Sequence, residues 1–474
     1  MMPRVHPATS STRNATYSGV PLEAFLQPVH HVGFVLLMLF FFMAFSRIMD
    51  VMLPIARLPL LTSLVVLLCM VLSGGLMRVW QAVEGKMLLG FTAWCIVCIP
   101  FSSWRGGSFA TVKDEWLKSL ICFMLVVGLT VTLRQVRRLM VTIAFATLLL
   151  TLMALVKQHR TLGRLSFDVG MFSNPNDLAQ ALLLGVPLLF ALNLPQSNVF
   201  YRLLTAAAAA PMILATIETG SRAAILAMLL MLLMVFVRVG YMGKLVLTLV
   251  IAAGGIVAVM VVPDAIRNRL TTVMGSQQEE AYVAEQEDVA AVASAESRKE
   301  LFLQSIRFTI QHPLFGVGPG TFQHASVAET TSIGERGMWR QTHNMYTQIS
   351  SECGLPGFAL YFGTVFVLFW KFRSLRKMCG NDPRLDEVRK MLLIYSTSFV
   401  SVLVTGTFSS VGYQLLLPSM IGIATVLHRA GLQEVMRIRG TAPAAGAPIW
   451  YAEPRRTVQP ARTKPVLTSR TPRF

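Results

Sequence analysis

Charged residues are scarce in this chain of 474 residues: they make up 14% of the sequence, against 54% hydrophobic residues. In ordinary soluble domains, about a quarter of the residues are charged. The apolar runs at 32–45, 58–76 and 223–237 approach the roughly 20 residues that cross a hydrocarbon layer. So many long runs leave little room for a buried soluble core, and the composition predicts an all-α, polytopic membrane protein.

The chain also lacks the cysteine and histidine patterns of a metal site. Cys95 and Cys98 form a C-x-x-C inside a predicted span, but no second pair of Cys or His accompanies them. This favours small packing residues over zinc ligands. Cys379 falls on the side predicted to be reducing, so no disulfide framework is indicated. We expect neither a metal nor a cofactor.

Hydropathy predicts about twelve spans around one long polar segment. They lie near 32–46, 58–76, 87–102, 116–133, 139–156, 178–194, 199–217, 223–237, 245–262, 352–370, 391–409 and 413–428. The predicted division is a cytoplasmic tail at 1–31, nine spans in 32–262, a large periplasmic loop at 263–351, three spans in 352–428, and a cytoplasmic, disordered tail at 429–474.

The net charge of +18 reflects topology rather than a nucleic-acid partner. Lys and Arg concentrate in the tails and in alternate loops, which places both termini inside and the long loop outside. The basic clusters at 134–138 and 371–377 then face anionic membrane lipids.

Two short motifs at predicted span ends carry polar residues. The motif Thr-Gly-Ser-Arg at 219–222 ends one span and opens the next. An Arg beside a span is costly and suggests function, although an interfacial Arg can also extend to water. The turn through Ser221 fixes Arg222 between two helix ends, which favours a functional role. At 171–178, Pro175 with Asn or Asp indicates a helix N-cap, and capping alone would explain Asn176 and its neighbours.

The long polar segment holds the remaining candidates. A helix is expected over 300–311, with Arg298 just before it, and 277–297 is either an exposed helix or a flexible insert. Gly316, Gly318 and Gly320 permit a turn whose backbone N–H groups could face an anion. No strand precedes this turn and no Lys-Ser/Thr follows it, so it is not a nucleotide-binding loop.

His343 precedes Asn344 where the loop returns to the membrane. A lone His is more often structural than catalytic. A base beside several Arg, however, suits one reaction: the guanidinium groups hold a diphosphate, and His accepts a proton from an attacking hydroxyl. Arg307, Arg336 and Arg340 are weaker candidates because only their positions recommend them.

Four motifs, in this order, resemble the bacterial O-antigen ligase and polymerase family. They are Met-Phe-Ser-Asn-Pro-Asn-Asp-Leu-Ala at 171–179, Thr-Gly-Ser-Arg-Ala at 219–223, His-Pro-Leu-Phe-Gly-Val-Gly-Pro-Gly at 312–320, and His-Asn at 343–344 followed by Glu-Cys-Gly-Leu-Pro-Gly at 352–357. The resemblance covers roughly 171–362, and the first five spans match only in hydropathy. Cys353 stands where family members often carry a small or apolar residue.

The resemblance implies a metal-independent, inverting GT-C-type glycosyltransferase at the periplasmic face of the bacterial inner membrane. Its donor would be a glycan on undecaprenyl diphosphate. The acceptor would be lipid A-core for a ligase or the next lipid-linked repeat unit for a polymerase, with protein O-glycosylation a third variant. The family's pattern corresponds to Arg222 and Arg298 as diphosphate-binding residues and His343 as the catalytic base. Ser221, Asn176, Gly318, Gly320, Asn344 and Glu352 would support them.

The alternative is a membrane transporter or a flippase for lipid-linked glycans. Such proteins often show internal repeats with polar residues at mid-span. This chain is instead asymmetric, with nine predicted spans, a loop and three more spans, and its polar candidates lie at the outer edge. The transferase is therefore the preferred hypothesis.

Overall fold

The computed structural model describes residues 22–53, 58–161, 163–194, 198–245, 247–249, 252, 285–332, 334 and 339–440. Within these residues the fold is helical, apart from one antiparallel pair of strands, β1 (Arg160–Thr161) and β2 (Arg164–Leu165). The α-helices are α1 (Leu22–Ser46), α2 (Ile48–Met52), α3 (Leu58–Leu72), α4 (Gly75–Gln81), α5 (Val83–Cys98), α6 (Arg105–Thr111), α7 (Leu117–Leu129), α8 (Leu133–Lys157), α9 (Pro175–Leu189), α10 (Val199–Glu218), α11 (Arg222–Phe236), α14 (Glu285–Gln311), α15 (Phe322–Ser332), α16 (Met345–Cys379), α17 (Asp386–Thr405) and α18 (Leu416–Ile438). Short 3-10 turns are η2 (Ile99–Phe101), η4 (Gly170–Ser173), η5 (Phe190–Asn193), η6 (Pro383–Leu385) and η7 (Gly406–Phe408), and η3 (Val112–Trp116) is a π-helical turn.

The helices match the predicted spans in place. In the part of the chain that the structure describes, seven helices are long and apolar enough to cross a membrane, or up to eight if the bent pair α3 and α4 forms one span. Each predicted span except 245–262 overlaps a helix, and that run lies largely outside the described residues. Helix α18 continues to Ile438, so the prediction of a disordered tail from residue 429 is wrong for 429–438. The chain is therefore a multi-pass helical membrane protein, and a number of about twelve spans stays a prediction.

One apolar run that the sequence predicts as a single span is broken. Gly74 has a φ of 71°, in the left-handed region that glycine tolerates, and α4 is bent by 79° relative to α3. The bend buries Arg78, whose guanidinium donates to the carbonyl oxygens of Ser73 and Gly128. Gly74 thus ends α3, and the bend brings Arg78 to the C-terminal end of α7, where its guanidinium donates to a backbone carbonyl oxygen.

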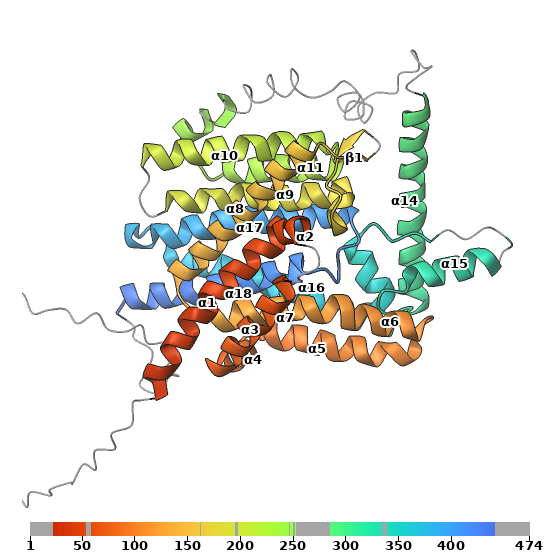
Figure 1. Ribbon diagram of the computed structural model, residues 1–474, viewed down its shortest axis with the longest axis horizontal. Coiled ribbons are helices and arrows are strands. Elements are labelled where there is room, and N and C mark those ends of the chain that lie inside the picture. The colour runs from red at the N-terminus through yellow and green to blue at the C-terminus, as the bar shows by residue number, and fades with distance from the viewer. Residues whose placement is uncertain are drawn as a thin grey trace, which may run out of the picture.

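Helix α9 lies at the centre of the bundle. Its span, Pro175–Asn193, is 83% buried, and α8, α10 and α17 pack around it. On the other side, α5 packs on α16 and α7 packs on α18 (Figure 1). Trp116 fills the space between α5 and α16, with its ring 4.7 Å from that of Phe91 and 5.5 Å from that of Tyr361. This aromatic packing holds α16 against α5, and α16 carries the site described below.

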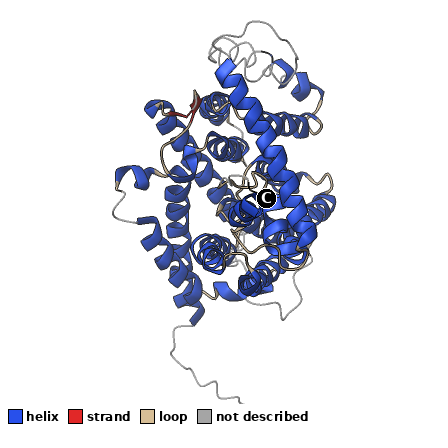
Figure 2. Cartoon of the chain, turned by 90° about the vertical axis from the view of Figure 1, so that its right-hand side faces the viewer, coloured by secondary structure: helices blue, strands red, loops and turns tan. Residues whose placement is uncertain are grey.

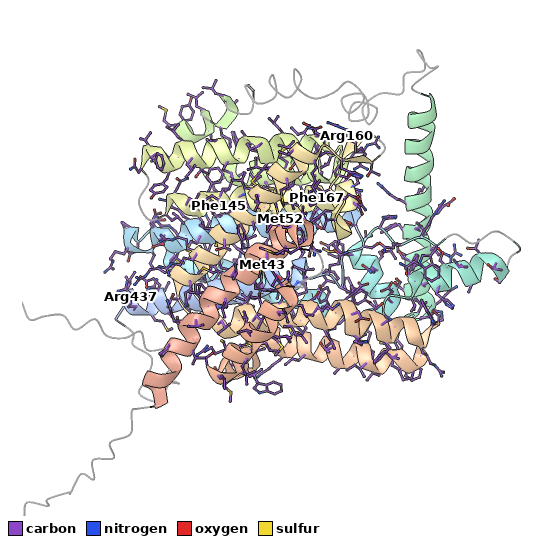
Figure 3. All side chains as sticks on the ribbon, in the orientation of Figure 1. Met43, Met52, Phe145, Arg160, Phe167 and Arg437 are labelled. Atoms are coloured by element: carbon purple, nitrogen blue, oxygen red, sulfur yellow. The ribbon has the colours of Figure 1, made fainter. Side chains whose placement is uncertain are left out.

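The two ends of the bundle differ. One end carries β1, β2, α14 and α15, and we call it the loop end. The other carries the first residues of α1 and the last of α18, and we call it the tail end (Figure 1). Arg160 on β1 and Arg437 near the end of α18 mark these opposite ends in Figure 3. Seen from the loop end, α14 crosses in front of the bundle (Figure 2).

The predicted loop therefore contains ordered helices. Helix α14 begins at Glu285 and includes the expected helix over 300–311, so most of 277–297 is helical, while 277–284 lies outside the described residues. The C-terminal part of α14 packs against α16. Met345 begins α16 several residues before the predicted span, which brings the end of the loop directly into a helix.

Candidate active site

The glycine-rich turn at 312–320 and the motif at 352–357 form one structural unit. The backbone N–H groups of Val317 and Gly318 donate to the carbonyl oxygens of Ser351 and Glu352, at 2.8 and 2.9 Å. In return, the N–H of Leu355 donates to the carbonyl oxygen of Pro313 at 2.8 Å. Two motifs that are separate in the sequence are therefore joined through their backbones. These hydrogen bonds attach the C-terminal end of α14 to α16.

Glycine is required where these segments approach each other. Gly354 has a φ of 68° inside α16, and a Cβ there would lie 2.0 Å from the carbonyl oxygen of Leu314. At Gly318 (φ 109°) a Cβ would lie 2.0 Å from Oγ of Ser102, and at Gly320 (φ 70°) 2.0 Å from Oγ1 of Thr111. Only a residue without a side chain fits these positions.

Glu352 occupies the place that the sequence suggested for an external anion. Its buried carboxylate accepts the N–H of Gly320 at 2.8 Å and the N–H of Phe322 at 3.3 Å. The prediction that the glycine turn faces a bound anion is therefore met by a carboxylate of the protein itself. Because both oxygens of Glu352 accept backbone N–H groups, this residue serves to hold the turn and the start of α15.

His343 lies in a strained backbone conformation at the entrance of α16. Its φ of 51° is in the left-handed region, which costs a residue with a side chain about 1–2 kcal/mol. Two contacts hold it there: its N–H donates to Oγ of Ser410 at 2.8 Å, and Asn344 caps α16 by accepting the N–H groups of Tyr346 and Thr347. Asn344 is thus a helix cap that sets the position of the neighbouring imidazole. Such strain is common at functional sites.

Two arginines lie close enough to His343 to change its titration. Burial lowers the pKa of His343 most, and the positive charges of Arg298 and Arg340 lower this pKa further. The imidazole is therefore neutral at neutral pH, which is the form that accepts a proton. The structure brings Arg298 and His343 together, as the sequence suggested, and adds Arg340, which sequence position alone had not distinguished from Arg307.

Arg222 is the first residue of α11. Gly220 has a φ of 56°, and Ser221 caps the helix by accepting the N–H of Ala224, so the predicted turn forms. The side chain of Arg222 is exposed. A cation in the first turn of a helix is unfavourable, because the helix dipole already makes this end positive. An anion placed here would therefore meet both the guanidinium and the helix N-terminus.

Arg164 joins two of the motifs, and sequence reasoning missed it. From β2, its Nε donates to the carbonyl oxygen of Thr219 at 2.7 Å, and its Nη2 donates to Oδ1 of Asn176 at 2.8 Å. The helix cap of α9 is Asn174, so Asn176 acts as a partner for Arg164. The two strands are too short to give an alternating pattern, and the sequence signal was only an Arg between two motifs.

A second link closes the site. Oγ of Ser409 donates to the buried carboxylate of Asp177 on α9, and the next residue, Ser410, holds His343. Helix α11 packs along α17, whose C-terminal end leads into this same turn. His343 and the start of α9 therefore both contact residues 409–410. No sequence motif had pointed to these two serines.

Other titratable groups at the loop end are engaged in ion pairs. Glu218 pairs with Arg160 at 3.0 Å, and Glu329 pairs with Arg307 at 3.2 Å. In the described residues no group of three or more His, Cys, Asp or Glu is arranged to hold a metal ion. All six cysteines lie within these residues and are free; the sulfur atoms of Cys95 and Cys353 approach to 3.9 Å.

Residues 207–362 match the family described as O-antigen ligase. The matched segment is about a third of the chain and includes Arg222, Arg298 and His343. It confirms the resemblance given by the motifs and supports an O-antigen ligase type of membrane glycosyltransferase. A comparison with curated proteins finds no match.

Proposed function

We propose that this O-antigen ligase family protein transfers a glycan from undecaprenyl diphosphate to an acceptor hydroxyl, at the periplasmic face of the inner membrane, with inversion and without a metal. The observation that supports this most directly is the neutral, strained His343 beside Arg298 and Arg340. A base among cations is suited to a reaction that removes a proton from a hydroxyl and develops negative charge on a leaving phosphate.

In the proposed reaction, Arg222 and Arg298 bind the diphosphate. Guanidinium groups match phosphate oxygens with two parallel hydrogen bonds and keep their charge at all relevant pH values. They stabilise the negative charge that grows as the bond between the sugar and the diphosphate breaks. His343 accepts the proton of the acceptor hydroxyl as its oxygen bonds to the anomeric carbon from the opposite face, which inverts that carbon.

Lipid A-core and the next lipid-linked repeat unit are the two candidate acceptors. They share a sugar hydroxyl as the nucleophile, so the chemistry at His343 is the same for both. Deletion of the gene followed by analysis of surface glycans separates them: lipid-linked polymer absent from lipid A indicates a ligase, and unpolymerised single repeats indicate a polymerase.

The test of the proposed reaction is transfer by purified protein from a lipid-diphosphate glycan to each acceptor in the presence of a metal chelator. We expect transfer to continue at the same rate, because Arg rather than a metal stabilises the leaving group. A loss of activity that Mg²⁺ or Mn²⁺ restores contradicts the metal-independent reaction. Movement of unaltered lipid-linked glycan across vesicles, without transfer, supports the flippase alternative.

A further inference from the structure

Two exposed tryptophans meet at the loop end, outside the residues discussed so far. Trp104 precedes α6 and is 47% exposed, and Trp339, between α15 and α16, is 59% exposed. Their ring centroids are 6.2 Å apart and their planes are inclined by 77°, so the two indoles form a corner. Exposed apolar side chains that lie together mark interaction surfaces, whereas single ones need no explanation.

The neighbouring glycines and His324 fix the position of the Trp104 indole. Gly106 and Gly107 lie in the first turn of α6, where glycine disfavours a helix by about 1 kcal/mol each. A Cβ on Gly107 would lie 2.3 Å from Cε3 of Trp104, so the indole rests on this backbone. His324 of α15 stacks on the same indole at 5.8 Å, and its Nδ1 is buried without a hydrogen-bond partner among the described residues.

The corner lies near the proposed reaction centre. Trp339 is the neighbour of Arg340, whose charge lowers the pKa of His343. His343 follows Trp339 by four positions in the chain, so their Cα atoms are at most about 14 Å apart. A glycan whose reacting end lies at His343 extends beyond it and needs contacts at about this distance.

We propose that Trp104 and Trp339 form a carbohydrate subsite, which stacks on a pyranose ring of the glycan near the bond being made. Sugar rings present a face of C–H groups with a rim of hydroxyls. The negative face of an indole attracts such C–H groups, while its N–H can donate to a hydroxyl. The subsite rests on the proposed function, because only a glycan substrate at His343 would bring a sugar to this corner.

The test compares Trp339→Leu with Trp339→Phe in the transfer assay. Leu keeps an apolar side chain but loses the flat ring, and Phe keeps the ring. We expect Trp339→Leu to raise KM for multi-sugar substrates about three- to tenfold, the effect of one aromatic stacking contact, with little change in kcat. Trp339→Phe should retain most of the affinity. Varying the glycan length of donor and acceptor separately shows which one occupies the corner.

Trp80 provides the matched control, since it is also 59% exposed but lies on α4, away from this corner. Trp80→Leu should leave KM unchanged. Equal KM values for wild type and Trp339→Leu at every glycan length overturn the subsite while transfer itself stands. Equal losses in Trp80→Leu and Trp339→Leu assign the indoles to membrane anchoring instead. Absence of transfer by the wild type overturns the proposed function first. Inhibition by free oligosaccharide released from the donor, weakened in Trp339→Leu, is the independent measurement.

Discussion

Arginines at the two ends of the bundle do different things. At the tail end, Arg78 and Arg429 donate to backbone carbonyl oxygens around the end of α7: Arg78 to Gly128, and Arg429 to Val127 and Thr130. These carbonyls lack partners within the helix, and the cations complement its negative end. At the loop end, Arg298 and Arg340 surround a histidine and Arg222 stands at a positive helix end.

We expect this difference to separate arginines that stabilise the fold from arginines that act in the proposed function. The tail-end arginines neutralise what the fold leaves unsatisfied, so they stabilise the protein without a ligand. At the loop end, two arginines lie near His343 and a third begins α11, and the proposed function assigns an anionic ligand to this end. Five substitutions test this contrast, and they are given from the largest expected effect on transfer to the smallest.

His343→Ala should reduce kcat about 10²–10⁴-fold, the usual contribution of a positioned general base. The variant should still fold, because the substitution breaks no ion pair and the backbone is held by Ser410 and by the Asn344 cap. Donor binding should remain, since the arginines are intact. His312→Ala, at an exposed position, is the control. Parallel loss of donor binding and transfer would make His343 a phosphate contact rather than a base.

Arg222→Lys should reduce transfer about ten- to hundredfold, because Lys keeps the charge but loses the planar fork that contacts two phosphate oxygens. Expression and membrane insertion should be unchanged for this exposed side chain. Full activity in Arg222→Lys would show that Arg222 is an interfacial residue that extends to water and does not contact the phosphates. Arg298→Ala tests the second proposed phosphate contact in the same assay.

Arg340→Ala should change the pH profile more than the rate at neutral pH. The base must be neutral, and the lowered pKa of His343 keeps it neutral to a pH below 6.5, the ordinary value for His. Removing one positive neighbour raises this pKa, so the acid limb of kcat/KM should move to higher pH by less than about one unit. Arg307→Ala, whose guanidinium pairs with Glu329, should leave the limb in place. A limb that is unmoved in Arg340→Ala would exclude His343 as the titrating group.

Arg78→Leu should leave kcat per folded protein unchanged while lowering the unfolding temperature. Leu cannot donate to the carbonyl oxygens of Ser73 and Gly128, which costs about 3–6 kcal/mol for two hydrogen bonds from a charged group. Arg384→Leu breaks an exposed pair with Asp382 and should lower the unfolding temperature far less, because solvent screens this pair. A selective loss of kcat in Arg78→Leu would remove the proposed division between the two ends.

The sequence was most informative about the helices and least informative about their polar contacts. Apolar length predicts α8, α9 and α17 because hydrocarbon imposes a minimum span. It missed the break at Gly74, since a glycine inside an apolar run is compatible with a continuous helix until packing is known. The pairing of the glycine turn with Glu352 was also hidden: a backbone N–H leaves no sign in the sequence of which acceptor it meets.

For the candidate site, sequence order indicated the motifs but not how they connect. Arg222, Arg298 and His343 were selected by chemistry and resemblance, and their catalytic roles stay predictions. Arg164, Ser409 and Ser410 were invisible, because a common polar residue gains meaning only from what it touches across the fold.

The attachment of α14 to α16 also has a mechanical consequence. The C-terminal end of α14 is fixed to α16 by two contacts: the carbonyl oxygen of Pro313 accepts a hydrogen bond from α16, and the carboxylate of Glu352 holds the glycine-rich turn. Arg298 lies 13 residues up this helix from Gln311, about 20 Å from the fixed point, so a tilt of about 5° there displaces the guanidinium by about 2 Å. Shifts of this size change transition-state contacts measurably. The helix is thus a lever whose pivot is set in the membrane-spanning bundle. In the proposed function, a small tilt of α14 would change the distance between Arg298 and a bound diphosphate.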